Sequence, residues 1–308
     1  MIVKDNNVGM LSAHVTLYLL TFTLNKYVLS VLNFTYPTIF QGWQVLVGGL
    51  LLKLATYSGR CSLSITSLDK PGFTSLVPHF LFFTGLIVSG SKALANLPIP
   101  VFLSLHNVIL VFVILLKMSS SLRTLPYIHI LGLVGTLLSA MFIVLFDLDM
   151  MLTDVPYFWM LIHILCAVVM DLHASISDAR YSATDRLYFS YIFSLIILTP
   201  ASLYLEEAFQ ALNFPDKTRY EFVFACLASG VTGVLLNISS IHIQSNDLAG
   251  KIQVVAKLVT CGLSLFLFNN VISYKVWTFI ILNFVSTLFL PNQPKEFDEG
   301  KEDGANLV

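Results

Sequence analysis

The sequence predicts an all-α integral membrane protein, with about ten transmembrane helices arranged as two inverted five-helix repeats. Of its 308 residues, 56% are hydrophobic and only 11% are charged, whereas a soluble domain is about 45–50% apolar and about 25% charged. The apolar residues also come in blocks separated by short polar breaks. Because a helix needs about 20 apolar residues to cross a hydrocarbon core of roughly 30 Å, these blocks indicate a polytopic membrane protein.

The polar breaks define the predicted spans. We expect them at residues 10–32, 37–57, 73–92, 97–117, 127–146, 157–175, 187–205, 220–242, 247–269 and 272–290. The segment that follows, residues 293–308, is polar and charged, so we expect a disordered and solvated tail. An even number of spans places both termini on the same side of the membrane.

Positively charged residues indicate which side that is, because they accumulate in cytosolic loops. If the termini are cytosolic, that side holds Lys4, Arg60, Lys70, Lys117, Arg123, Arg180, Arg186, Lys295 and Lys301. The opposite side then holds Lys92, Lys217, Arg219 and Lys275, together with the acidic residues Asp147, Asp149, Asp154, Glu206 and Glu207. The asymmetry predicts cytosolic termini.

The predicted spans divide into two groups of five, residues 1–150 and residues 151–292. Because five is odd, two homologous halves would lie in opposite orientations in the membrane. Inverted repeats with a binding site near the bilayer midplane are a common plan among transporters. The fourth span of each half carries polar groups within its apolar block, which indicates such a site.

Three lysines fall inside predicted spans, where a charged side chain costs about 2.5–3.5 kcal/mol on insertion scales. Lys257 is the most informative, since roughly ten residues separate it from either end of the ninth span. Lys26 and Lys251 are nearer to span ends, so snorkelling to the membrane surface is an equal alternative for both. A lysine deep in a span favours a cavity or an anionic partner over contact with lipid.

Polar residues share one helical stripe in several spans. In the ninth span, the stripe holds Asn246, Gly250, Gln253, Lys257 and Ser264. Similar stripes hold His14, Tyr18, Thr21 and Asn25 in the first span, and Ser229, Gly233, Asn237 and Ser240 in the eighth. Small and polar residues also mark helix–helix contacts, which is a sufficient explanation for the eighth span but a poor one for a lysine.

The fourth and seventh spans add further candidates. His106 and Asn107 lie in the fourth span, after prolines 98 and 100, which restrict the start of that helix. A lone membrane histidine is more often a packing group than a ligand.

The seventh span begins with Tyr188, Phe189, Tyr191 and Phe193, followed by Ser194. An aromatic belt at the membrane surface is the ordinary explanation, and stacking on a nucleobase is the alternative.

Lysines, amides and aromatic faces in one cavity would suit a ligand that carries phosphate, sugar hydroxyls and a base, because ammonium groups neutralise phosphate. A net charge of −1 gives no basic field for nucleic acid. The four cysteines have no metal-ligand or disulfide spacing. No paired carboxylates, zinc motif or catalytic triad is present in the sequence, so we expect neither an enzyme nor a metal or cofactor.

Two segments resemble a known family. The segment Asn25–Gln44, NKYVLSVLNFTYPTIFQGWQ, resembles the opening of the nucleotide-sugar and triose-phosphate transporter family. The segment Ile99–Asn107, IPVFLSLHN, resembles the fourth span of its GDP-mannose transporter branch. The resemblance implies ten spans as inverted repeats in a Golgi membrane, and exchange of a cytosolic nucleotide sugar for a lumenal nucleoside monophosphate. A homodimer is one option for its assembly.

The resemblance is incomplete at the motifs that contact substrate in that branch. Lys257 matches the lysine that closes the ninth-span motif Gly-Ala-Leu-Asn-Lys, but residues 253–256 depart from it. The seventh-span motif Phe-Tyr-Asn-Asn aligns with residues 188–191, where both asparagines are replaced. His106 and Asn107 match a basic residue followed by asparagine, with histidine in place of lysine. The lost asparagines favour a UDP-sugar over GDP-mannose. Within that class, UDP-N-acetylglucosamine is what the resemblance implies, because no residue selects the sugar.

Residues and resemblance together predict a substrate site. Its phosphate ligands are Lys257, Lys26 and Lys251, and its base and sugar contacts are Gln253, Asn246, Asn107, His106, Tyr188, Tyr191, Ser194 and Asn25. A GDP-mannose carrier, a general drug or metabolite exporter and a membrane scaffold without transport activity remain alternatives.

Overall fold

The computed structural model describes residues 2–58, 65–121, 125–148, 155–176, 180–244, 249–268 and 272–291. Across these ranges the secondary structure is helical, without strands. The elements are α1 (Ile2–Lys26), the π-helix η1 (Tyr27–Val31), α2 (Pro37–Tyr57), α3 (Lys70–Asn96), α4 (Ile99–His106), α5 (Val108–Ser121), α6 (Tyr127–Leu148), α7 (Val155–Ile176), α8 (Ala183–Tyr204), α9 (Glu207–Leu212), α10 (Tyr220–Gln244), α11 (Ala249–Leu267) and α12 (Tyr274–Leu288).

Long apolar helices dominate this part of the chain. Eight candidate spans are long and apolar enough to cross a membrane: α2, α3, α4 with α5, α6, α7, α8, α10 and α11. The apolar helix α12 is shorter, at 15 residues, and α1 is not among the eight. The predicted class, a helical membrane protein, is confirmed. The count of ten spans stays a prediction, because the predicted spans at residues 10–32 and 272–290 fall on α1 with η1 and on α12, which are not among the eight.

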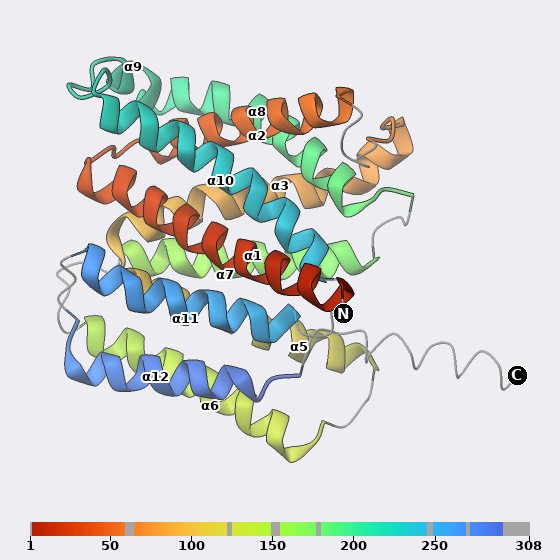
Figure 1. Cartoon of the computed structure of the whole chain (residues 1–308), viewed down its shortest axis with the longest axis vertical. Helices are drawn as coiled ribbons and strands as arrows, with labels where there is room; N and C mark the ends of the chain where they lie inside the picture. Colours follow the sequence, from red (N-terminus) through yellow and green to blue (C-terminus); the bar gives the residue numbers. More distant parts are fainter. Residues whose placement is uncertain are drawn as a thin grey trace, which may run out of the picture.

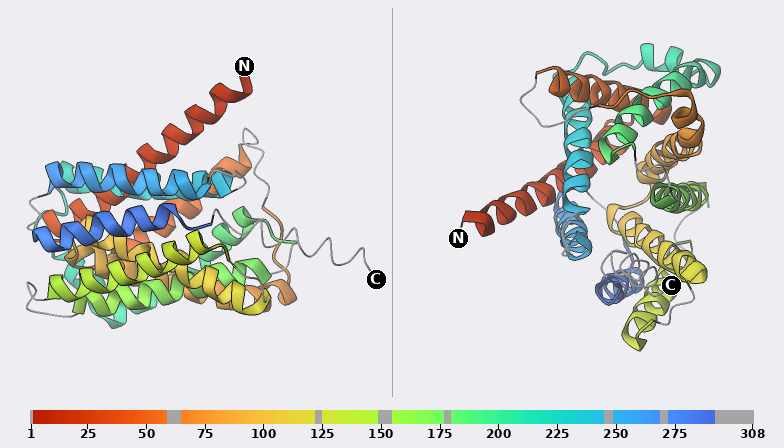
Figure 2. Two further views of the ribbon diagram at one scale, coloured as in Figure 1. Left: turned by 90° about the horizontal axis from the view of Figure 1, so that it is seen from below. Right: turned by 90° about the vertical axis from the view of Figure 1, so that its right-hand side faces the viewer.

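The long helices lie side by side and alternate in direction (Figures 1 and 2). The start of α1, the start of α3 and the end of α12 share one end of the bundle, which we call the terminal side. The short helix α9 lies at the opposite end, which we call the α9 side. The first turns of α1 project beyond the other helices (Figure 2).

Large apolar side chains cover the outside of the bundle. On α7, Phe158, Leu161 and Leu165 recur at steps of three and four residues, and each is more than half exposed. On α6, Leu131 and Leu145 lie on the same kind of outward face. Contiguous apolar surface of this extent is rare on soluble monomers, whereas lipid chains would cover it without cost.

The interior is formed by close helix pairs: α3 with α7, α2 with α8, α6 with α12, and α1 with both α10 and α11. Small residues allow some of these approaches. A Cβ at Gly48 of α2 would lie 2.5 Å from the Tyr191 ring of α8, so glycine is required there for the two helices to pack as they do. This contact fixes the position of Tyr191, which is one of the predicted site residues.

The backbone leaves helical geometry at the start of the predicted fourth span. Pro98 precedes α4, and Leu97 before it is extended, so α3 and α4 are separated at that point. At Asn107, between α4 and α5, the backbone keeps right-handed helical dihedrals, and the Asn107 N–H bonds the Ser104 carbonyl at 3.2 Å in one tighter turn. Helices α4 and α5 therefore form one continuous span.

Candidate functional site

A cavity of about 280 Å³ lies among α1, α2, α3, α7, α8 and α10. Its polar lining includes Asn25, Gln41, Gln44, His163, Tyr191 and Asn237, while Phe22, Phe83 and Phe102 supply aromatic surface. Sites for small organic ligands have this character, mostly apolar with a few fixed polar groups. Of the predicted site residues, Asn25 and Tyr191 line the cavity.

Asn25 belongs to a polar cluster on one wall. Its Oδ1 accepts hydrogen bonds from Gln44 Nε2 at 2.8 Å and from Ser229 Oγ at 2.7 Å. Gln44 also donates to Ser229. The cluster joins α1, α2 and α10 and fixes the orientation of the amides that face the cavity.

Tyr191 forms the next part of the wall. Its hydroxyl accepts a hydrogen bond from Asn237 Nδ2 at 2.8 Å, and its ring lies 5.8 Å from that of Phe83. The neighbouring Tyr188 is half-buried and packs against a cluster of apolar side chains. Ser194 is fully buried, and its Oγ lies 2.8 Å from Thr84 Oγ1, away from the cavity lining. Tyr191 and Phe83 therefore offer the aromatic surface that a base requires.

Two buried polar atoms on the cavity wall lack a hydrogen-bond partner within the described structure. They are Thr21 Oγ1 and His163 Nε2. Leaving a buried polar atom unsatisfied costs about 1–3 kcal/mol, so such atoms are expected where water or a ligand completes the bonding. The two side chains make this cavity a candidate binding site.

Lys257 lies behind this cavity, outside its lining, and only 7% of its surface is exposed. Its Nζ donates to Asn107 Oδ1 at 2.7 Å and lies 3.3 Å from His106 Nδ1. The His106 ring lies 5.4 Å from the ring of His163, which does line the cavity. No carboxylate neutralises Lys257 within the described part of the chain. The structure thus brings together the three predicted residues 106, 107 and 257.

The same network continues toward α6 and α12. Asn107 Nδ2 donates to Asn283 Oδ1 at 2.9 Å. Asn283 in turn donates to the Thr136 carbonyl at 3.1 Å and to Ser139 Oγ at 3.0 Å. The Asn107 amide is therefore bound by Asn283 of α12, which is in turn bound to α6. Sequence reasoning did not identify Asn283, although a lone asparagine in an apolar helix is the signal that could have found it.

The remaining predicted lysines lie elsewhere. Lys26 Nζ donates to the carbonyls of Leu94, Ala95 and Leu97, at 2.9, 3.1 and 2.9 Å. These carbonyls end α3 and have no helical partner because α3 stops before Pro98. Lys251 is exposed near the start of α11. Gln253 is half-buried on the same helix, and Asn246 lies outside the described residues.

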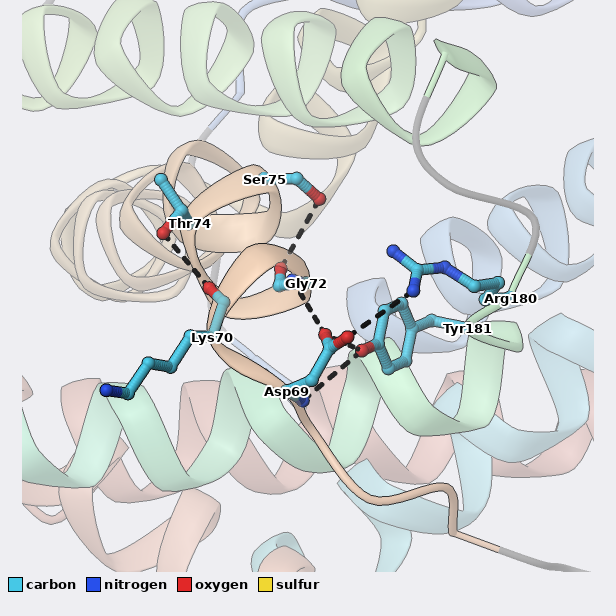
Figure 3. Close-up of polar contacts among 7 residues, drawn as sticks. All are labelled: Asp69, Lys70, Gly72, Thr74, Ser75, Arg180 and Tyr181. Carbon is cyan, nitrogen blue, oxygen red and sulfur yellow. Dashed lines mark hydrogen bonds and ion pairs between the residues drawn. The ribbon is translucent and has the colours of Figure 1, made fainter.

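A clamp on the terminal side joins the start of α3 to the start of α8 (Figure 3). The Asp69 carboxylate accepts bonds from the Tyr181 hydroxyl at 2.7 Å, the Gly72 N–H at 2.8 Å and Arg180 Nη1 at 3.4 Å. The hydrogen bonds from Tyr181 and Gly72 lower the pKa of Asp69. A lowered pKa makes the clamp stabilising above the ordinary value near 3.8, and that contribution is lost only as the pH falls through the lowered pKa.

We expect Gly72→Ala to open this clamp. A Cβ at Gly72 would lie 2.1 Å from the Tyr181 hydroxyl and 2.6 Å from Asp69 Oδ1. Overpacking of this kind costs about 1–3 kcal/mol, so the purified variant should unfold at a lower temperature. Gly262→Ala is the matched control, because its Cβ would meet nothing within 4 Å. Equal thermal stability of both variants would show that the clamp is not rigid.

No protein-family model matches the chain, but the chain is similar to known proteins over most of its length. It is 38% identical over 262 residues to the UDP-N-acetylglucosamine transporter TMEM241 homolog of Xenopus laevis, covering 82% of this chain and 85% of that protein. It is also 38% identical over 267 residues to the UDP-N-acetylglucosamine transporter TMEM241 of Mus musculus, covering 82% and 86% of the two chains.

A more distant relative transports GDP-mannose by its name, which is the alternative substrate that the sequence left open. The GDP-mannose transporter of Aspergillus niger is 24% identical over 295 residues, covering 85% of this chain and 74% of the transporter. The similarity to the two TMEM241 proteins is higher and extends over most of their length. This multi-pass membrane protein therefore belongs to the nucleotide-sugar transporter family, together with the TMEM241 proteins.

Proposed function

We propose that this protein carries UDP-N-acetylglucosamine across the Golgi membrane in exchange for a lumenal nucleoside monophosphate. One observation carries the proposal: a cavity inside the bundle combines amide, hydroxyl and aromatic groups with buried polar atoms that lack partners. The relatives at 38% identity bear the name of this substrate. The exchange partner, the Golgi location and cytosolic termini are parts of the same proposal.

Two inverted halves, residues 1–150 and 151–292, would provide alternating access. Helix packing supports this division. If α1, α2, α3, α4 with α5, and α6 correspond to α7, α8, α10, α11 and α12, each principal contact has a counterpart. The pair α3–α7 corresponds to α10–α1, and α1–α11 corresponds to α7–α5. The pairs α2–α8 and α6–α12 correspond to themselves, as expected for contacts on a two-fold axis.

Within the site, we assign the base to the wall formed by Tyr191, Phe83 and Asn237, and sugar hydroxyls to the amides of Asn25 and Gln44. Lys257 would contribute a positive charge from behind His106 and His163, and Asn107 holds its ammonium in place. The carbonyl contacts of Lys26 support a structural role on the α9 side. Lys251, Gln253, Tyr188 and Ser194 stay predictions and do not belong to the described cavity lining, and Asn246 stays a prediction outside the described residues.

Uptake into proteoliposomes tests the function. We expect vesicles preloaded with UMP to accumulate labelled UDP-N-acetylglucosamine several-fold faster than empty vesicles, because exchange needs a lumenal counter-substrate. Asn237→Ala should slow this uptake, while Asn96→Ala, at an exposed asparagine outside the cavity lining, should not. Faster uptake of GDP-mannose into vesicles preloaded with GMP would assign the protein to the other substrate class.

A further inference from the structure

A second cavity, of about 190 Å³, lies next to the central one on the terminal side. The two cavities share Phe83, Met170 and Asn237 in their linings, so they adjoin one another. The second is lined by the first turns of α8, at Ala183 and Arg186, and by the last turns of α10, at Ser240 and Gln244. We call it the mouth cavity, since helix ends on the terminal side surround it.

Two buried atoms in the mouth cavity lack a hydrogen-bond partner within the described structure. They are Ser190 Oγ and His79 Nδ1. Ser190 is fully buried and His79 is only 8% exposed. The Ser190 hydroxyl can donate or accept a hydrogen bond, whereas His79 Nδ1 accepts one, because the ring bonds the Met170 backbone through its other nitrogen. An unsatisfied buried group costs about 1–3 kcal/mol, so a polar occupant that bonds the Ser190 hydroxyl would remove such a cost.

Arg186 brings positive charge to the same lining. The first turn of α8, which carries it, is fixed on both sides. Ser182 and Asp185 form a reciprocal capping box, and Asp185 Oδ1 also accepts the Thr66 N–H at 2.8 Å. A guanidinium held by such a turn suits phosphate, because its planar donors match two phosphate oxygens at once.

One carboxylate, Asp171, also lines the mouth cavity. Lys117 of α5 lies within electrostatic range of it, so the carboxylate has a cation of its own nearby. Neither Lys257 nor any other lysine belongs to the lining of the two adjoining cavities. Among the described lining residues, Arg186 is therefore the side chain with a permanent positive charge.

We propose that Arg186 and Ser190 form an anion subsite for the diphosphate of the nucleotide sugar when it enters from the terminal side. Arg186 neutralises the phosphate charge, and the Ser190 hydroxyl donates a hydrogen bond. The base then reaches Tyr191 and Asn237, since Asn237 lines both cavities. The assignment rests on the proposed function for the identity of the nucleotide, but the subsite for phosphate is defined by the mouth cavity alone.

Binding measurements on the purified full chain in lipid nanodiscs test the subsite. The probes are UDP-N-acetylglucosamine, UMP, uridine and inorganic pyrophosphate. We expect Arg186→Gln to weaken binding of the three phosphate-bearing probes about 10-fold or more, while uridine binds as it does to the wild type. Ser190→Ala should show the same pattern with a smaller effect. Arg186→Lys, which keeps the charge, should retain part of the affinity.

Arg180→Gln is the matched control, because Arg180 lies on the same side of the bundle, is exposed and pairs with Asp69. It should bind all four probes as the wild type does. Equal loss by Arg180→Gln would mean a general surface potential and would overturn the subsite. The subsite would also be overturned if Arg186→Gln weakened uridine binding as much as it weakens binding of the phosphate-bearing probes, because that indicates a structural role. It would equally be overturned if Arg186→Gln bound pyrophosphate and UMP as the wild type does.

The two proposals fail separately in this experiment. If the wild type binds pyrophosphate and UMP in a manner that depends on Arg186 but does not bind UDP-N-acetylglucosamine, the subsite stands and the substrate assignment is wrong. If UDP-N-acetylglucosamine binds equally well to the wild type, Arg186→Gln and Ser190→Ala, the transporter assignment stands and the subsite is wrong.

Discussion

Lys257→Met should reduce nucleotide-sugar uptake by about 10-fold or more while the protein still folds. The Lys257 ammonium is buried and has two neutral partners, Asn107 and His106, with no carboxylate among the described residues. Removing the charge therefore leaves no opposite charge uncompensated, so the cost in stability should be small compared with breaking a buried ion pair. An anionic substrate in the cavity would, however, no longer be attracted by the positive charge of Lys257, which lies behind the cavity wall.

The measurement is initial uptake of labelled UDP-N-acetylglucosamine into proteoliposomes, at equal amounts of reconstituted protein. Lys251→Met is the matched control, because Lys251 lies on the same helix but is exposed, and it should transport as the wild type does. Lys257→Gln provides a second variant that keeps a hydrogen-bond donor for Asn107 without the charge. If both Lys257 variants transport normally, the charge is not needed and Lys257 only holds the Asn107 side chain in place.

Hydropathy was sufficient to predict the helices, because the length of an apolar block follows directly from membrane thickness. The hydrogen-bond network around Asn107 was beyond this reasoning. Residues 97–117 read as one apolar span, whereas the network includes Asn283, Ser139 and Thr136, which lie on helices distant in sequence. A periodicity argument describes one helix at a time and cannot identify partners on another.

The site was predicted only in part for the same reason. Asn25 and Tyr191 line the cavity, and His106, Asn107 and Lys257 meet behind it. A polar stripe shows that a helix face is not exposed to lipid, but it does not say whether a cavity or another helix covers that face. Asn237 illustrates the ambiguity, since helix packing was a sufficient explanation for its stripe although it lines both cavities. The charge pattern placed Arg186 in a cytosolic loop, where positively charged residues are common, so Arg186 was not predicted as a site residue.

Lys26→Met should lower the stability of the protein, by about 4.5–9 kcal/mol if each of the three lost charge-assisted hydrogen bonds contributes about 1.5–3 kcal/mol. The Lys26 ammonium is 5% exposed and donates to three carbonyls at the end of α3 and in the turn before α4. Lys26 thus replaces the helical N–H groups that α3 cannot have because Pro98 follows. Methionine fills a similar volume but leaves the buried carbonyls of Leu94 and Leu97 without these donors.

Unfolding in mixed detergent micelles measures this loss, with Lys53→Met as the matched control because Lys53 is an exposed lysine on α2. The control should unfold as the wild type does. The experiment also separates the two roles considered for Lys26. A phosphate ligand would lose affinity for UMP on substitution and keep its stability, whereas a residue that caps α3 would lose stability first. Because all three short contacts of Lys26 are to backbone carbonyls and Lys26 itself does not line the cavity, we expect the second outcome, and unchanged unfolding of Lys26→Met would contradict it.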